Sequence, residues 1–377
     1  MKQQKIKGEG SYLATECDKV GEIALHYGFT IIKPPQISPS DISKAKQFKD
    51  FDYYNDVEEK VALTSWYIDR DLHNQSQLIA IHYKKPRENL YSFEIMGSDK
   101  SISEGLLLKC ALAVLYELGW TNLYIDINSI GDKESVGKFE RELGAYFRKH
   151  THTLSAKLNQ KFRKNHYSIL TDNSPESQSF RQDAPQTVGS LSDIARVHFK
   201  EVLEFLETFS VAYKIKPNVL SNKLYASYTV FEIRNDDQLL AYGYRYNHLA
   251  RKIGAKRDIP SVGLTVLVKK QPKFSKKVII KNIKKPKFYL VQLGETAKLK
   301  VLNVIEMLRR EKIPVYHSIT KDKMVGQLSG AEYMKATHVL VMGQKEAVEN
   351  TMIVRSIASR EQETVPLDKL VKFLKKL

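Results

Sequence analysis

The strongest constraint on the fold lies in residues 288–377, where strand-like and helix-like segments alternate along the chain. A strand is predicted at 287–293, and a helix follows Gly294 because apolar side chains then recur at helical spacing. The alternation continues to the last segment, where Leu367, Leu370 and Leu374 fall on one helix face. This pattern predicts a mostly parallel sheet covered by helices.

A lysine-rich segment precedes that region. Residues 269–287, KKQPKFSKKVIIKNIKKPK, contain nine lysines and no acidic residue, and contribute +9 of the net charge of +17. Clustered lysines gain free energy when they displace condensed counterions from phosphates, which favours contact with a polyanion. Lysine contacts phosphates more than it reads base edges, so sequence specificity is not indicated. The alternative is a solvated linker whose charges repel one another.

Length and composition limit the other possibilities. A chain of 377 residues is expected to form two domains, here residues 1–268 and 288–377, joined by the linker 269–287. It contains no apolar run of the roughly 20 residues needed to cross a bilayer and no signal peptide, so we expect no membrane contact and a cytoplasmic location. Two cysteines and the absence of HExxH spacing predict no structural metal.

The first region has strong local signals. Residues 101–119 have apolar side chains at intervals of three to four residues, which predicts a buried helix that ends at Gly119. The next segment, LYIDIN, alternates as a strand does. YASYTVFEI and LLAYGYRY are two further strands, and the turn at 235–237 between them predicts an antiparallel pair.

The terminal region resembles the anticodon-binding domain of the class II aminoacyl-tRNA synthetases for histidine, glycine, threonine and proline. The similarity runs through LVQLGETAKLKVLNVIEMLRREKIPV and QLSGAEYMKATHVLVMGQKEA. In the first region it narrows to histidyl-tRNA synthetase. HYGFTIIKPPQIS is similar to that family's first motif, which implies a homodimer with Pro35 at the interface.

Further segments resemble the same family. FEIMGSDKSISEGLLLKCALAVLYELGW follows the second motif and places a pocket carboxylate at Glu94. Residues 123–150 look like the family's strand, turn and helix, 184–207 like part of its helical insertion, and 228–254 like its histidine-binding strands. The resemblance implies an α+β fold: an antiparallel synthetase sheet module with a helical insertion at about 146–207, followed by the α/β domain.

Two of the family's catalytic motifs are altered in the first region. IHYKKP (81–86) aligns with FRyErP and puts His82 in the arginine's place, and the loop that should fold over ATP is nearly absent. LTSW (63–66) aligns with LRPE and has Thr64 and Trp66 where the family has an arginine and a glutamate. Adenylation needs guanidinium groups fixed against developing negative charge, so these changes indicate a loss of catalysis.

Two later motifs are altered as well. SNKLYA (221–226) aligns with RGLDYY, replaces its arginine with Ser221 and keeps Tyr225. GLTVLVKK (263–270) aligns with the third motif and ends in Lys270 instead of arginine. Lysine could supply part of the lost positive charge, but not the planar fork of a guanidinium.

The segment GYRYN (243–247) aligns with GGRYD, in which glycine lets the substrate approach the strand. Here Tyr244 replaces that glycine, and Arg245 is kept. We interpret Tyr244 and Trp66 as fillers of the former histidine pocket. Because side chains alternate between the faces of a strand, the alternative is that Tyr244 points to the opposite face and blocks nothing.

Three functions remain open. The first is a non-catalytic paralogue that binds tRNA or another structured RNA through the terminal domain and the linker, with the following lysines as contacts: Lys269, Lys270, Lys273, Lys276, Lys277, Lys281, Lys284, Lys285 and Lys287. The second is a divergent histidine–tRNA ligase, and only then would ATP and Mg²⁺ be cofactors. The third is a regulatory protein that resembles the catalytically inactive subunit of ATP phosphoribosyltransferase. That subunit typically lacks the terminal domain.

Overall fold

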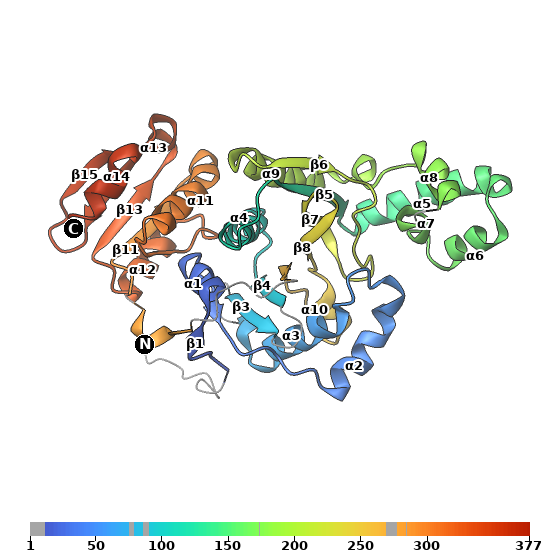
Figure 1. The fold of residues 1–377 in the computed structure, drawn as a ribbon, viewed down its shortest axis with the longest axis horizontal. Coiled ribbons are helices and arrows are strands. Elements are labelled where there is room, and N and C mark those ends of the chain that lie inside the picture. The colour runs from blue at the N-terminus through green and yellow to red at the C-terminus, as the bar shows by residue number, and fades with distance from the viewer. Residues whose placement is uncertain (1–11, 75–78, 86–89, 173, 269–276, 284) are drawn as a thin grey trace.

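The computed structural model describes residues 12–74, 79–85, 90–172, 174–268, 277–283 and 285–377. Within these residues a central body carries a large sheet, a helical lobe extends from one end, and a C-terminal domain with its own sheet lies at the other end (Figure 1). The predicted order, an antiparallel sheet module with a helical insertion followed by an α/β domain, is confirmed.

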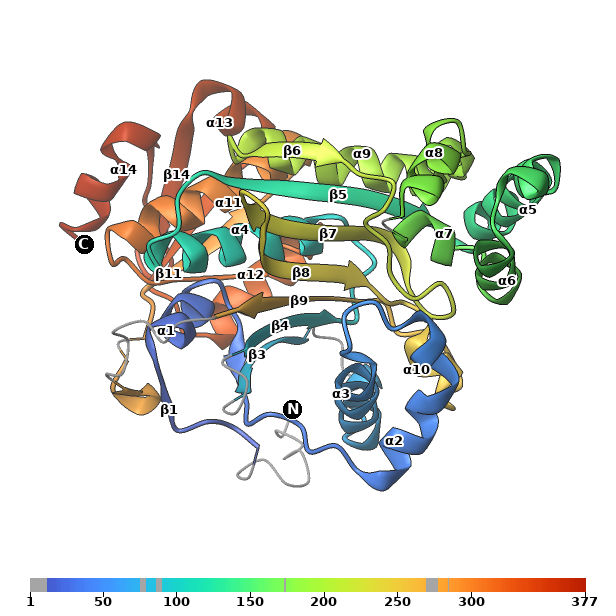
Figure 2. The same ribbon diagram turned by 45° about the vertical axis from the view of Figure 1, so that its right-hand side comes forward.

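Eight described strands form the sheet of the body, and Figure 2 shows most of them side by side. All neighbouring strands are antiparallel except the outermost pair at each edge. In the order in which they pair, the strands are β2 (Thr30–Ile31), β3 (Ile79–Lys85), β4 (Leu90–Met96), β9 (Ser261–Leu267), β8 (Gln238–Arg245), β7 (Ser227–Asn235), β5 (Leu123–Gly131) and β6 (Ala212–Ile215).

Helices cover both faces of this sheet. The first face is covered by α1 (Lys19–His26), α4 (Ile102–Glu117) and α9 (Asp193–Thr208). The predicted helix at 101–119 is α4, and it is buried almost all round because apolar side chains surround it. The second face is covered by α2 (Pro39–Ala45), α3 (Val57–Asp69) and α10 (Leu249–Lys252).

The lobe consists of α5 (Lys133–His150), α6 (Ala156–Lys164), α7 (Ser168–Thr171) and α8 (Pro175–Gln182). Aromatic side chains form its centre, and the rings of Phe147 and Phe162 stack 3.7 Å apart. Although α9 lies within the range predicted for the insertion, it packs on α4 of the body. Within the stretch of mainly polar residues before α9, Ser174 caps α8 and Pro175 occupies its first turn.

The C-terminal sheet has the order β12-β11-β13-β14-β15. Its first two pairings are parallel and its last two are antiparallel, so the sheet is mixed and not mostly parallel as predicted. The strands are β11 (Phe288–Gln292), β12 (Val315–His317), β13 (His338–Met342), β14 (Thr351–Ser356) and β15 (Gln362–Pro366). The helices are α11 (Glu295–Arg310), α12 (Met324–Tyr333), α13 (Gln344–Glu349) and α14 (Leu367–Leu374).

Helix α11 joins the C-terminal domain to the body, because its apolar side chains belong to the same core cluster as those of α4 and α9. At the edge of this contact Tyr27 donates a hydrogen bond to Glu306 (2.8 Å), and His26 Nε2 donates one to the carbonyl of Ile305 (3.1 Å). A short ribbon of β1 (Glu16–Cys17) and β10 (Val278–Ile279) also ties the described end of the linker to the body.

None of the helices in the described part of the chain is both long and apolar enough to cross a bilayer. Over the same residues, no group of three or more His, Cys, Asp or Glu side chains is arranged to hold a metal ion.

Candidate functional site

Strand β8 decides which side chains face helix α3. Its side chains alternate, so Tyr242 and Tyr244 point to the second face, while Gly243 and Arg245 point to the first. The neighbouring strands leave no room at Gly243, because a Cβ there would overlap Phe231. The alternation therefore places the ring of Tyr244 between the sheet and the segment that leads into α3.

Tyr244 fills this space and is 1% exposed. Its hydroxyl donates a hydrogen bond to Asp56 Oδ1 (2.7 Å) and lies 3.4 Å from the hydroxyl of Tyr225. The ring of Tyr54 lies nearly parallel to that of Tyr244, with planes 12° and centroids 6.1 Å apart, and itself stacks on Tyr242. Two segments distant in sequence, 54–56 and the one that holds Tyr225, thus enclose one phenol, and burial raises the pKa of Tyr244 well above its usual value.

Glu94 lies beside this group of aromatic rings and has no exposed surface. Lys60, from α3, forms an ion pair with Glu94 Oε1, and Tyr246 donates a hydrogen bond to Oε2 (2.8 Å). The ammonium group of Lys60 also lies 5.1 Å from the ring centroid of Tyr246 and 5.5 Å from that of Tyr244. Burial raises the pKa of Glu94, and Lys60 opposes that shift.

Sequence reasoning missed several members of the site, among them Asp56, Tyr246 and the cation of the buried pair, Lys60. Lys60 lies 34 positions before Glu94, and no motif assigns it a partner. The available signal was its position on α3, where a lone base shares the helix face of the buried Leu63, Thr64 and Tyr67. A lysine on an apolar helix face needs a buried anion, because an unpaired charge there would be very costly.

Gly263 on β9 gives the Lys60–Glu94 pair its space, since a Cβ at this position would overlap both Glu94 Oε2 and Lys60 Nζ. We expect Gly263→Ala to lower the free energy of unfolding by about 1–3 kcal/mol, because the pair must move or break. Urea denaturation measures this change. Gly189→Ala is the matched control, because its added methyl meets no atom within 4 Å. Equal stability of the two variants would contradict the tight packing of the pair.

His82 does not face this site, contrary to the prediction. It pairs in register with Phe93 and stacks on that ring at 4.4 Å, whereas Glu94 pairs with Ile81. The side chain of His82 therefore points to the opposite face of the sheet. There its Nδ1 donates a hydrogen bond to the carbonyl of Ser92 (2.9 Å). Burial lowers the pKa of His82 to about 4, so the imidazole is neutral at pH 7.

Thr64 and Trp66 take separate positions on α3. Thr64 is buried and donates a hydrogen bond to the carbonyl of Lys60 (2.7 Å) within the helix. Trp66 is turned by about 120° from Lys60 around the helix axis. It packs edge-on against Tyr12 and lies under the guanidinium of Arg70. The prediction that Trp66 fills the space beside Tyr244 is therefore wrong, because the helix directs it elsewhere.

The segment at 221–226 contributes one ring to the site. Tyr225 is 1% exposed and packs edge-on against Phe48, with ring centroids 5.1 Å apart. Ser221 is also buried, and the next residue, Asn222, ties the segment to the carbonyl of Phe48 (2.9 Å). Glu94, Tyr225 and Tyr244 are thus brought together, whereas Lys270 lies outside the described residues, as does the shortened loop at 86–89.

Arg245 lies on the first face of the sheet and has no exposed surface. It forms an ion pair with Glu104 (2.5 Å) and donates hydrogen bonds to the carbonyls of Ser98 and Lys100. His198 also bonds Glu104, at 2.8 Å. Burial by itself would raise the pKa of Glu104, but Arg245 and His198 hold it well below the usual value. Arg245 is part of the core and is not directed at Tyr244.

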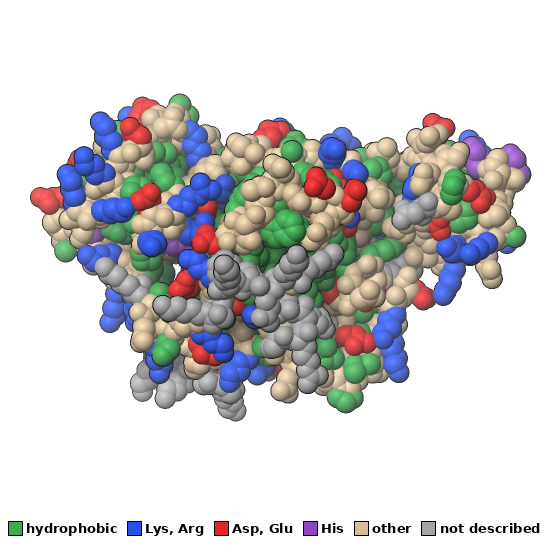
Figure 3. All heavy atoms as spheres, in the orientation of Figure 1, with side chains coloured by type: hydrophobic (Ala, Val, Ile, Leu, Met, Phe, Trp, Pro, Cys, Tyr) green, Lys and Arg blue, Asp and Glu red, His purple; other side chains and the backbone are tan. Residues whose placement is uncertain are grey.

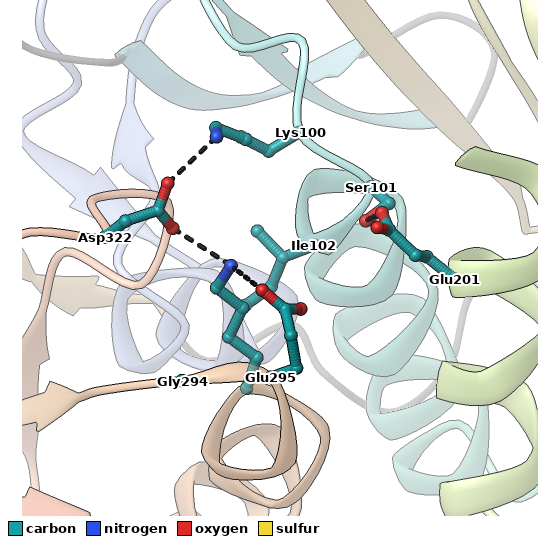
Figure 4. Close-up of a pocket in the computed structure, with 8 residues that line it drawn as sticks. Lys100, Ser101, Ile102, Glu201, Gly294, Glu295 and Asp322 are labelled. Carbon is teal, nitrogen blue, oxygen red and sulfur yellow. Dashed lines mark hydrogen bonds and ion pairs between the residues drawn. The ribbon is translucent and has the colours of Figure 1, made fainter. Parts of the chain in front are cut away.

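A cavity of about 370 Å³ lies between the body and the C-terminal domain. Figure 4 shows the carboxylate of Asp322 paired with Lys100 of the body (2.8 Å). The same carboxylate pairs with Lys298 of α11 (3.0 Å). On the body side, Ser101 donates a hydrogen bond to Glu201 (2.5 Å). The charges around this cavity are satisfied by one another, so the arrangement links the domains.

The lysine segment is described in part. Lys277, Lys281, Lys285 and Lys287 are exposed. The remaining predicted contacts lie outside the described residues: Lys269, Lys270, Lys273, Lys276 and Lys284.

Both regions of the chain are similar to known proteins. Residues 278–377 match the family described as anticodon binding domain. The chain is 26% identical over 329 residues to a histidine–tRNA ligase of Thermosynechococcus vestitus. The aligned region covers 81% of this chain and 75% of that ligase. The chain is also 28% identical over 293 residues to the ligase of Halothermothrix orenii, covering 75% and 69%. The match to the histidine–tRNA ligase of Chlorobium phaeobacteroides covers 66% of that protein's length.

The fold also matches a solved structure. The histidyl-tRNA synthetase of S. aureus, crystallised without ligand, superposes with a TM-score of 0.53 at 19% identity, over 95% of this chain and 94% of that one. At this identity the match supports the fold alone.

Proposed function

Because this chain belongs to the histidyl-tRNA synthetase family, we propose that it is a member that has lost aminoacylation and binds RNA. One observation carries the first half of the proposal. Tyr244 occupies the position where the family's strand has glycine, and its phenol is closed in by Asp56, Tyr225 and Tyr54. A substrate that needs a close approach to this strand meets a ring.

The charges of the site support the same conclusion. Glu94, which the resemblance assigns to the pocket, is fully buried and already neutralised by Lys60. The positions assigned to the family's arginines hold Thr64, His82 and Ser221. His82 faces away and is neutral, and no guanidinium among the described residues contacts the Lys60–Glu94 pair. Over the residues that the structure describes, the site therefore lacks the fixed guanidinium groups that adenylation requires.

RNA binding rests on other features. The last hundred residues match an anticodon-binding domain, and the relatives named above are tRNA ligases. The described linker lysines are exposed, and the charge of the whole chain is +17. Exposed lysines without an acidic neighbour gain most from counterion release, so the proposed partner is tRNA or another structured RNA, bound mainly through its phosphates.

We expect the affinity for bulk tRNA to fall by several hundred-fold between about 50 and 200 mM salt, as follows when about five phosphates are neutralised. Fluorescence anisotropy across a salt series measures the slope. Binding to a duplex RNA of unrelated sequence should show a similar slope, because lysine reads no base edges. Absent or salt-independent binding would remove RNA binding from the proposed function.

A divergent active histidine–tRNA ligase is the second candidate, because the relatives have that name. It would require ATP, Mg²⁺ and histidine to enter a site that is now filled. The reading as a regulatory subunit of a phosphoribosyltransferase is disfavoured, since the chain carries the anticodon-binding domain. Dimerisation near Pro35 stays a prediction. In that segment Pro35 is partly exposed and Ile37 is 42% exposed, as an apolar interface needs.

A further inference from the structure

The last helix, α14, has a lysine face that the charge pattern of the linker did not reveal. At 100° per residue, Lys369 and Lys372 lie about 60° apart around the helix axis, and Lys376 follows in the turn just beyond the helix end. All three are exposed, whereas Leu370 and Leu374 on the other side are buried in the domain core. The helix is held by its apolar side and presents ammonium groups outward.

This face lies next to the linker, although the two are some ninety positions apart in sequence. Lys287, at the end of the linker, donates a hydrogen bond to the carbonyl of Leu377 (3.1 Å), directly beyond α14. From Lys287 the chain runs back through Lys285 and Lys281 to β10 on the body. Figure 1 shows α14 and the C-terminus at one end of the molecule, and Figure 3 shows many basic side chains over that end.

Most of these lysines have no acidic partner among the described residues. Lys281, Lys285, Lys369, Lys372 and Lys376 form no ion pair there. Two neighbours do: Lys277 with Glu16, and Lys375 with Glu311 (2.6 Å). Asp368 is the single acidic residue of α14. Unpaired lysines that repel one another are stabilised by a ligand with regularly spaced negative charges.

We propose that the described linker lysines Lys281, Lys285 and Lys287 and the outer face of α14 form one binding surface for the phosphate backbone of RNA, an inference that rests on the proposed RNA-binding function. The surface contains lysines and no arginine, so it would contact phosphates without reading bases. An anionic membrane is a poorer partner. A membrane-bound helix inserts its apolar face, and that of α14 is already buried.

The test compares three full-length variants with the wild type in salt titrations against bulk tRNA. The first, the α14 variant, removes two lysines of the helix and one of the turn after it (Lys369→Gln, Lys372→Gln and Lys376→Gln). The second removes two linker lysines (Lys281→Gln and Lys285→Gln). The third is a control with the same change in charge as the first, at exposed lysines of the body: Lys46→Gln, Lys252→Gln and Lys256→Gln. Circular dichroism confirms that each variant is folded.

We expect the α14 variant to bind tRNA at least about tenfold more weakly at low salt. The slope of log affinity against log salt should fall by about 2 to 3, at 0.7 to 0.9 per phosphate contact. The linker variant should lose about 1 to 2 of slope, and the control should keep the wild-type slope. If the wild type binds tRNA but the α14 variant keeps its slope, the shared surface is wrong and RNA binding stands. If the wild type binds phosphatidylserine vesicles and not tRNA, both proposals fail.

Discussion

Arg245→Met is expected to lower the free energy of unfolding by about 3–5 kcal/mol, because it leaves the Glu104 carboxylate buried without its cation. Neither side chain of this pair has any exposed surface. The change also removes the donor to the carbonyls of Ser98 and Lys100, in the loop that leads into α4. Urea denaturation at pH 7 measures the loss. Lys164→Met is the control, because its pair with Asp50 is 73% and 64% exposed and should contribute under about 1 kcal/mol.

A second variant separates the loss of the pair from the cost of an isolated charge. Removing both partners, with Arg245→Met and Glu104→Leu, leaves no uncompensated anion in the core. The double variant should therefore lose less stability than the sum of the two single changes. If the losses simply add, Arg245 and Glu104 act independently, and the core of the body does not depend on their pairing.

Local patterns predicted much of the fold. The hairpin of β7 and β8, the buried helix α4 and the Gly294 start of α11 follow from alternation, helical spacing and turn residues. Strand β15 was missed because QETVP has only one buried side chain and no alternating apolar pattern. The C-terminal sheet is mixed because β14 pairs antiparallel with β13, although α13 lies between them, and because β15 follows β14 as a hairpin.

The candidate site was harder to predict, because it depends on which face of a strand each side chain points to and on contacts between residues distant in sequence. Tyr244 could be placed once the direction of a single side chain was chosen. His82 was misplaced by the same rule, since a shift of one residue in alignment moves a side chain to the other face of the sheet. The partnership of Lys60 with Glu94 joins a helix to a strand, and no local pattern specifies which buried acid a buried lysine meets.

Histidine-dependent exchange of pyrophosphate into ATP is expected to be at least about a million-fold slower than in an active histidine–tRNA ligase. Each missing electrostatic stabiliser costs about a hundredfold to a thousandfold in turnover, and three of the assigned arginines are absent, so this figure allows for non-additive effects. We further expect Tyr244→Gly to leave the exchange rate unchanged. It opens space beside Asp56 but restores none of the missing guanidinium groups.

The ligase of Thermosynechococcus vestitus, assayed in parallel, provides the active reference. Calorimetric titration with histidine separates binding from chemistry. A filled site predicts no heat of binding for the wild type, whereas a vacated pocket in Tyr244→Gly can accept the ligand and still be unable to activate it. Measurable exchange by the wild type would mean that cations from elsewhere reach the substrate, and the loss of aminoacylation would then have to be abandoned. Exchange that arises only in Tyr244→Gly would instead identify the tyrosine as the one block on a site that is otherwise competent.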